Sequence, residues 1–208
     1  MRPVLASLLA LGLSTLAAPA AAAEVQPNTV RLNEVERGFW VGSTVGGVVY
    51  FQTPGEGAGI GSGALVGVEA GFDVTRTLQL GLVAWGQAIG AEADYKGITD
   101  TELDPKGARG DFQSLLAGAM LRWSFLRFAD DNGIDRTFLY VRGAGGPAIS
   151  RPVGVIGDGF WGAAGLGVEY FTRLRHFSIG LEANGLAMMT DDGDAYGVAV
   201  LPHLKYSF

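Results

Sequence analysis

Residues 196–208 have the sequence YGVAVLPHLKYSF, in which apolar residues alternate with small or polar ones. A period of two is the period of a β-strand, because successive side chains point to opposite faces. The segment also exceeds the roughly 9 to 11 residues that a tilted strand needs to cross a bilayer. One face would carry Tyr196, Val198, Val200, Pro202, Leu204, Tyr206 and Phe208, and the other Gly197, Ala199, Leu201, His203, Lys205 and Ser207.

The same period of two recurs upstream in the chain. In one example, Ala64, Val66 and Val68 alternate with Leu65, Gly67 and Glu69. We therefore predict an all-β fold of antiparallel strands in up-and-down order. Its eight strands are predicted over residues 38–51, 62–73, 77–89, 110–124, 136–146, 158–171, 177–189 and 196–208.

Alternation alone does not show which face of these strands points outward. A soluble barrel would place its apolar face inside and a richly charged face in water. Here the second face consists mostly of glycine and small residues with isolated charges, which suits the crowded interior of a narrow barrel. We therefore expect the apolar face to contact lipid, so the fold class is an eight-stranded transmembrane β-barrel. A soluble barrel that holds a ligand is the alternative.

The composition agrees with a membrane barrel. Hydrophobic residues make up 48% of the chain and charged residues 17%, and 33 glycines lie within alternating segments. No segment after residue 23 is a continuous apolar run long enough for a membrane helix. The net charge of −6 disfavours nucleic acid as a partner. The chain has no cysteine, which excludes disulfides, thiolate metal sites and a lipidated cysteine.

The first 23 residues have the pattern of a secretory signal peptide. Arg2 supplies the positive charge, residues 5–16 form the apolar region, and residues 17–23 supply small residues for cleavage. A transmembrane anchor is the alternative, but the apolar region is short for spanning a bilayer. We expect 1–23 to be the signal, 24–37 a periplasmic tail and 38–208 the barrel.

The connections between the predicted strands alternate in length. The odd-numbered connections are polar and mostly long, at 52–61, 90–109, 147–157 and 190–195. Two even-numbered ones, 74–76 and 172–176, are tight turns, and 125–135 is longer. In outer-membrane barrels long loops face outward and short turns face the periplasm. We therefore expect extracellular long loops and periplasmic termini.

Three short motifs carry a resemblance to a known superfamily. They are the C-terminal KYSF (205–208), GFDVT (71–75) followed by LQLG (78–81), and GLGVEY (165–170). Residues 38–208 resemble the small outer-membrane barrels of the OmpA membrane domain and OmpX. The resemblance implies outer-membrane lipid and the barrel-assembly machinery as partners. In such barrels that machinery reads a C-terminal signal, here Tyr206 and Phe208.

A narrower resemblance rests on the polar lead VRLNEVERGFW (30–40) before the glycine-rich barrel. It is similar to the CglE-type barrels of myxobacterial adventurous gliding motility. That resemblance implies an accessory role in adhesion and motility, with other envelope or motility proteins as partners.

Six charged residues fall on the predicted inward face of the strands. Because a lone buried ion is costly, these charges must pair or hydrate. They could form a gate that opens a small pore, or a static plug that fixes the register, and we favour the plug. The inward assignment is less simple for Arg142, because it shares its face of the strand with the large aromatic residues Phe138 and Tyr140. The six are Glu69, Glu169, Glu182, Arg122, Arg142 and Lys205.

The sequence offers no clear catalytic or metal site. The acidic segment 90–109 could bind a divalent cation, and DDGD (191–194) lacks the later ligands of a calcium loop. His203 and Ser207 share a face but lie about 13 Å apart along a strand. We therefore expect no enzyme, cofactor or metal.

Three function classes remain open for such a barrel. We expect a structural or adhesive surface component that acts within a gliding motility or envelope complex. A narrow channel for small solutes is the alternative. A lipid-modifying enzyme would need a catalytic pair near the outer leaflet, which the sequence does not show.

Overall fold

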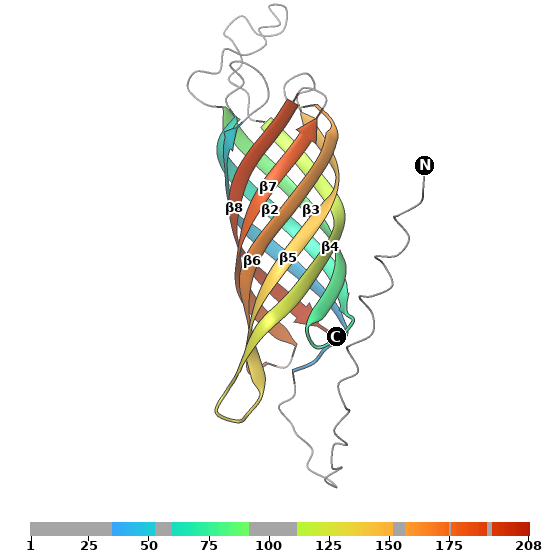
Figure 1. Cartoon of the computed structure of the whole chain (residues 1–208), viewed down its shortest axis with the longest axis vertical. Helices are drawn as coiled ribbons and strands as arrows, with labels where there is room; N and C mark the ends of the chain where they lie inside the picture. Colours follow the sequence, from blue (N-terminus) through green and yellow to red (C-terminus); the bar gives the residue numbers. More distant parts are fainter. Residues whose placement is uncertain (1–34, 53–59, 92–111, 152–156, 175, 191–192) are drawn as a thin grey trace, which may run out of the picture. The chain divides into compact units, whose positions relative to one another are not determined.

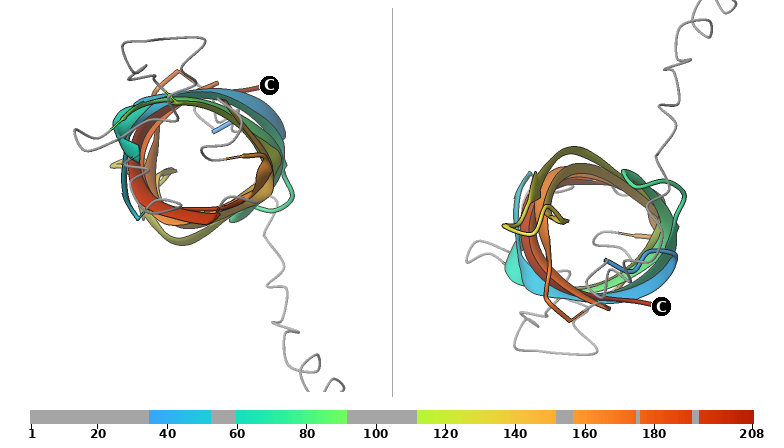
Figure 2. Two further views of the ribbon diagram at one scale, coloured as in Figure 1. Left: turned by 90° about the horizontal axis from the view of Figure 1, so that it is seen from above. Right: turned by 90° about the horizontal axis from the view of Figure 1, so that it is seen from below.

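The strands form one closed barrel, in which each strand pairs antiparallel with its neighbours in sequence and β8 closes on β1 (Figures 1 and 2). The computed structural model describes residues 35–52, 60–91, 112–151, 157–174, 176–190 and 193–208. The strands are β1 (Phe39–Gln52), β2 (Ile60–Asp73), β3 (Leu78–Ala91), β4 (Phe112–Ala129), β5 (Asp135–Arg151), β6 (Gly159–Phe171), β7 (Phe177–Thr190) and β8 (Gly193–Ser207).

This architecture confirms the predicted all-β fold of eight antiparallel up-and-down strands. Within the described ranges, no helix is long and apolar enough to cross a membrane. The predicted signal (1–23) and all but the last three residues of the predicted tail lie outside the described residues.

The barrel has two different ends. The turns β2–β3, β4–β5 and β6–β7 lie at one end together with Phe208, and we call this the turn end (Figure 1). The strand ends that the other four connections join lie at the opposite end, the loop end. These connections include 53–59, 92–111, 152–156 and 191–192, which are outside the described residues, as is most of the predicted acidic segment.

The outward face of the strands is apolar along its length. In β8, Val198 and Val200 are about half exposed, whereas Ala199, Leu201 and Lys205, which occupy the alternate positions, are buried. The predicted assignment of the two faces of this strand is therefore the one observed. Other exposed apolar side chains, one from each remaining strand, are Val45, Val66, Leu82, Leu121, Ile149, Phe160 and Leu181.

Strands β4 and β5 are longer than the sequence predicted, at 18 and 17 residues. Their hairpin projects beyond the neighbouring turns (Figure 1). A register shift between Ser124 and Leu126 makes consecutive residues exposed there, which breaks the period of two. The predicted loop 125–135 is therefore mostly strand. Its tight turn contains Gly133 in the left-handed region, at φ 72°. In a smaller correction, β8 begins at Gly193 rather than at residue 196.

Large inward side chains pack over glycines on the adjacent strand. Trp85 lies directly opposite Gly67, and a Cβ atom on that glycine would overlap the indole ring. The glycines on the inward face therefore make room for bulky neighbours in a narrow lumen. The same arrangement pairs Trp40 with Gly71, Tyr50 with Gly197, Tyr140 with Gly167, and His203 with Gly180.

Candidate functional site

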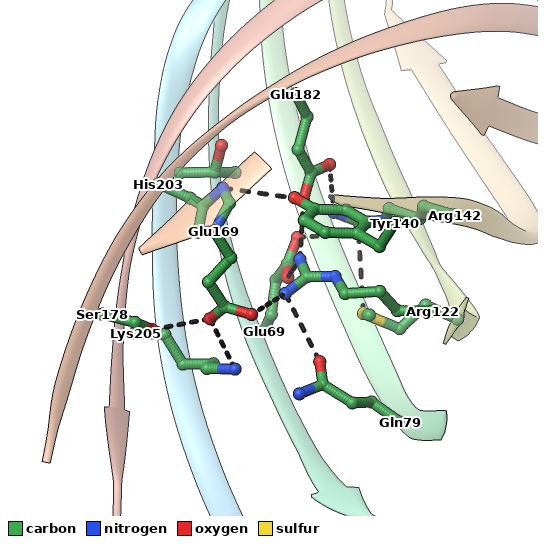
Figure 3. Close-up of polar contacts among 12 residues, drawn as sticks. Glu69, Gln79, Arg122, Tyr140, Arg142, Glu169, Ser178, Glu182, His203 and Lys205 are labelled. Carbon is green, nitrogen blue, oxygen red and sulfur yellow. Dashed lines mark hydrogen bonds and ion pairs between the residues drawn. The ribbon is translucent and has the colours of Figure 1, made fainter. Parts of the chain in front are cut away.

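The structure brings all six sequence-predicted lumen charges together in one buried network in the turn-end part of the lumen (Figure 3). Each side chain reaches the lumen because it occupies an inward register position on its strand. Six different strands contribute one residue each: Glu69 on β2, Arg122 on β4, Arg142 on β5, Glu169 on β6, Glu182 on β7 and Lys205 on β8.

Glu182 is the centre of this network. One carboxylate oxygen accepts hydrogen bonds from Arg122 Nη2 at 2.6 Å and from the hydroxyl of Tyr140 at 2.7 Å. The other accepts from Arg142 Nη1 at 2.7 Å and from the amide of Asn184 at 3.1 Å. Both oxygens are thus satisfied twice, which a buried carboxylate requires.

The other two carboxylates extend the network across the lumen. Glu69 pairs with Arg142 Nη2 at 2.7 Å and with Arg122 Nη2 at 3.7 Å. Glu169 pairs with Lys205 Nζ at 2.5 Å and accepts from the hydroxyl of Ser178 at 2.6 Å. Arg122 therefore has all three carboxylates around it, since Glu169 lies 3.7 Å from its Nη1 atom.

Aromatic rings cover the cations of this network. Arg122 lies 4.3 Å from the ring centre of Tyr140, and Arg142 lies 4.9 Å from that of Trp85. Cations over aromatic faces are stabilised by the ring quadrupole, and desolvation strengthens the effect. With three carboxylates and three cations, the six predicted residues carry no net charge when all are ionised.

Sequence reasoning missed two members of the network, Tyr140 and His203. The aromatic residues Phe138 and Tyr140 make an inward face hard to recognise in β5, but both face the lumen together with Arg142. His203 Nδ1 lies 3.6 Å from Glu182, and neither ring nitrogen has a hydrogen-bond partner among the described residues. The inward register of these residues was the available signal.

Toward the loop end the lumen is apolar rather than charged. Trp85 and Trp161 are buried there with ring centres 5.1 Å apart, and Trp161 Nε1 donates to the carbonyl of Ala117 at 3.0 Å. The alternating sequence pattern predicted mostly small residues on the inward face, so it did not predict this buried aromatic and aliphatic layer. Its other buried members include Tyr50, Leu65, Ile89, Phe112, Leu116, Leu186, Met188 and Leu201.

At the turn end a second cluster fixes the β4–β5 hairpin. Asp130 accepts backbone hydrogen bonds from Asn132 and Ile134 and a 2.7 Å bond from Arg136 Nε. Arg136 also donates to the carbonyl of Thr172 at 2.8 Å, which joins two neighbouring turns. The hydrogen bonds from Arg136 and the Ile134 backbone lower the pKa of Asp130 to about 2.

The two predicted C-terminal signal residues point outward at the turn end. Tyr206 stacks on His176 with ring centres 5.2 Å apart, and it contacts Phe208 edge-on at 4.9 Å. Phe208 is 61% exposed. The two rings therefore belong to an aromatic surface at this rim, which Phe39 and Phe177 extend.

The described part of the chain holds no cluster of three or more His, Cys, Asp or Glu side chains arranged for a metal ion. DDGD (191–194) lies partly outside this region.

No protein-family model matches the chain, and no curated protein matches its sequence. Among solved structures, the outer membrane protein OprG from Pseudomonas aeruginosa matches with a TM-score of 0.50 and 12% identity, over 85% of this chain and 99% of that one. Neisserial surface protein A matches with a TM-score of 0.56 and 13% identity, over 84% of this chain and 100% of that one. The chain has the fold of the small outer-membrane barrels. At these identities the likeness concerns the fold alone.

Proposed function

We propose that this chain is a bacterial outer-membrane barrel that serves as a non-enzymatic structural or adhesive surface component. The proposal rests on one observation, that the outward face of the strands is apolar while charged residues lie inside the barrel. Exposed Val, Leu and Phe side chains cover the outside, while Glu69, Glu169 and Glu182 are buried inside with their cations. A barrel in water would be expected to have the opposite distribution.

The proposal includes an orientation. In a small outer-membrane barrel the short turns face the periplasm, so the turn end and both termini would lie there and the loop end outside the cell. The exposed aromatic residues at the turn end, among them Phe39, Tyr206 and Phe208, would then lie at the periplasmic membrane interface. The barrel-assembly machinery would read Tyr206 and Phe208 during insertion.

The packed lumen supports a structural role. Paired charges cross the lumen on the turn-end side, and buried aromatic and aliphatic residues fill its loop-end side. An eight-stranded barrel is just wide enough for side chains to fill it. The protein would therefore act through its surface loops, within an envelope complex. A place in a gliding motility complex rests on the resemblance of residues 30–40 alone, and its test is cell motility after gene deletion.

A narrow channel is the second candidate function. Several buried polar atoms in the lumen have no hydrogen-bond partner among the described residues, including Gln87 Nε2, Asn184 Oδ1 and both ring nitrogens of His203. Such atoms are commonly satisfied by buried water. A hydrated path between them would be the route for a small solute, and electrical conductance of the purified barrel tests it.

Gel mobility of the outer-membrane fraction, with and without boiling, tests the location. We expect the unboiled protein to migrate as a compact species and to shift on heating. Recovery from the soluble periplasmic fraction without a shift would contradict the proposal, and a ligand-holding soluble barrel would replace it.

The lack of cysteine allows a clean test of orientation. Asp194→Cys at the loop end and Asp131→Cys at the turn end both introduce a thiol at an exposed position. On intact cells a membrane-impermeant maleimide should label only the first variant. Labelling of only the Asp131→Cys variant would reverse the orientation while leaving the membrane location intact.

A further inference from the structure

A groove of about 430 Å³ lies on the outward face of β2–β5, near the loop end. Small residues, among them Gly86, form its floor. Gly86 pairs directly with Val66 on one side and with Leu115 on the other. A Cβ atom added at Gly86 would meet only Val66, at 3.9 Å. The groove is therefore an open apolar depression bordered by larger side chains.

One end of the groove is polar. Gln113 and Arg151 are directly paired on β4 and β5, and both are exposed on the outward face. Arg151 Nη1 donates to the carbonyl of Ser150 at 2.7 Å and to Asp158 at 3.0 Å. Its Nε and Nη2 groups have no hydrogen-bond partner among the described residues. A guanidinium with two donor groups that no described residue engages thus lies at one end of an apolar groove.

A membrane lipid has the matching chemistry. Its acyl chain is apolar, and its phosphate accepts paired hydrogen bonds in the geometry that a guanidinium offers. Basic residues beside a membrane span are a recurrent means of binding anionic headgroups. Arg151 is the last residue of β5 at the loop end and follows exposed Ile149 on the same face, so in a membrane barrel we expect the cation to lie near the lipid headgroups.

We propose that this groove binds one acyl chain of lipid A, the phosphorylated glycolipid of the outer leaflet, with a lipid phosphate on Arg151. The choice of leaflet rests on the proposed function, which places the loop end outside the cell. Asp158 competes with the phosphate for Arg151, so the carboxylate sets how tightly the lipid is held.

Native mass spectrometry of the folded full-length barrel in detergent, titrated with bis-phosphorylated lipid A, tests the proposal. Arg151→Gln removes the charge and should weaken lipid A binding about tenfold, as loss of a charge-assisted hydrogen bond implies. Gly86→Leu fills the groove and should weaken binding similarly. Gly143→Leu is the matched control, because Gly143 is an outward glycine on β5 whose added Cβ would meet nothing within 4 Å.

A fourth variant should change affinity in the opposite direction. Asp158→Asn keeps an oxygen that can accept from the Ser150 backbone, as Asp158 does at 3.1 Å, but it removes the competing charge. We expect tighter lipid A binding. A purely structural role of Arg151 would instead make this variant neutral or harmful to binding.

Three outcomes would overturn the proposal. They are unchanged binding in Arg151→Gln and Gly86→Leu, equal loss in Gly143→Leu, and equal binding of phosphatidylglycerol in place of lipid A. These outcomes are distinguishable from failure of the proposed function, since boiling-dependent gel mobility reports the folded barrel and thiol labelling reports its orientation without lipid A.

Discussion

At the scale of single residues, the lumen is organised by pairs of a bulky side chain and a glycine. Trp85 is fully buried between Trp161 and the guanidinium of Arg142, so it has no room to move when Gly67 gains a side chain. Gly67→Ala should destabilise the barrel by about 1–3 kcal/mol, the usual cost of overpacking a core. Urea unfolding followed by tryptophan fluorescence measures this.

Gly143→Ala is the control for that prediction, because a Cβ there meets nothing within 4 Å. It should be neutral or slightly stabilising, since alanine restricts the unfolded chain more than glycine does. Equal destabilisation by both substitutions would show that the cost comes from strand glycines in general, not from the contact with Trp85.

The charge of Glu182 is the second prediction at the residue scale. Glu182→Gln leaves Arg122 and Arg142 buried with one carboxylate fewer between them. Breaking a buried ion pair in this way costs about 3–5 kcal/mol in unfolding free energy. The double variant Glu182→Gln/Arg142→Gln should lose less than the sum of the two single variants, which a double-mutant cycle measures. A loss below about 0.5 kcal/mol in Glu182→Gln would indicate a solvated lumen and not a plug.

At the scale of elements, the sequence predicted the strands that keep a strict period of two. Apolar residues alternate with glycine or polar residues over 164–170 and 177–184, and β6 and β7 match the predicted ranges within one residue. The β4–β5 hairpin was predicted too short, because the bulge after Ser124 exposes Phe125 and Leu126 in succession. A local register shift of this kind leaves no periodic signal in the sequence.

The turn of that hairpin should respond to acid. The folded pKa of Asp130 is about 2, below the value near 3.8 of an unperturbed aspartate. Its carboxylate therefore stabilises the hairpin fully above about pH 5, and this contribution is lost as the pH falls from about 4 toward 2. The difference in unfolding free energy between wild type and Asp130→Asn should be constant at pH 5–7 and should shrink over that acidic range.

Asp131→Asn serves as the neighbouring control for the acid response. Asp131 is exposed in the same turn, and its side chain makes no hydrogen bond or ion pair with the described residues. Its substitution should leave the unfolding free energy unchanged at every pH tested. An identical pH profile for the two variants would mean that the general charge of the turn matters, and not the bond from Asp130 to Arg136.

At the scale of the whole molecule, the lumen combines a part that the sequence predicted and a part that it did not. The inward charges followed from strand register, since each lies an even number of positions from other inward residues of its strand. Their partners did not, because the eight strands must close into a barrel before Glu182 on β7 meets both Arg122 and Arg142 on β4 and β5. The apolar layer was hidden because Trp85 and Trp161 interrupt a face of glycine and small residues.

The charged layer and the apolar layer follow one another along the lumen, and together they predict whether the barrel conducts ions. The charged layer is paired, and the mainly apolar layer on its loop-end side offers an ion few polar ligands, so entry would carry most of the cost of dehydration. The wild-type barrel in a planar lipid bilayer should therefore show no steady conductance. Trp85→Ala/Trp161→Ala removes the two stacked rings and should open ion-conducting events, whereas outward Trp123→Ala should not, because Trp123 is half exposed on the lipid-facing side. Steady conductance of the wild type would instead favour the channel function, with the unpartnered polar atoms of Gln87 and Asn184 as its hydrated path.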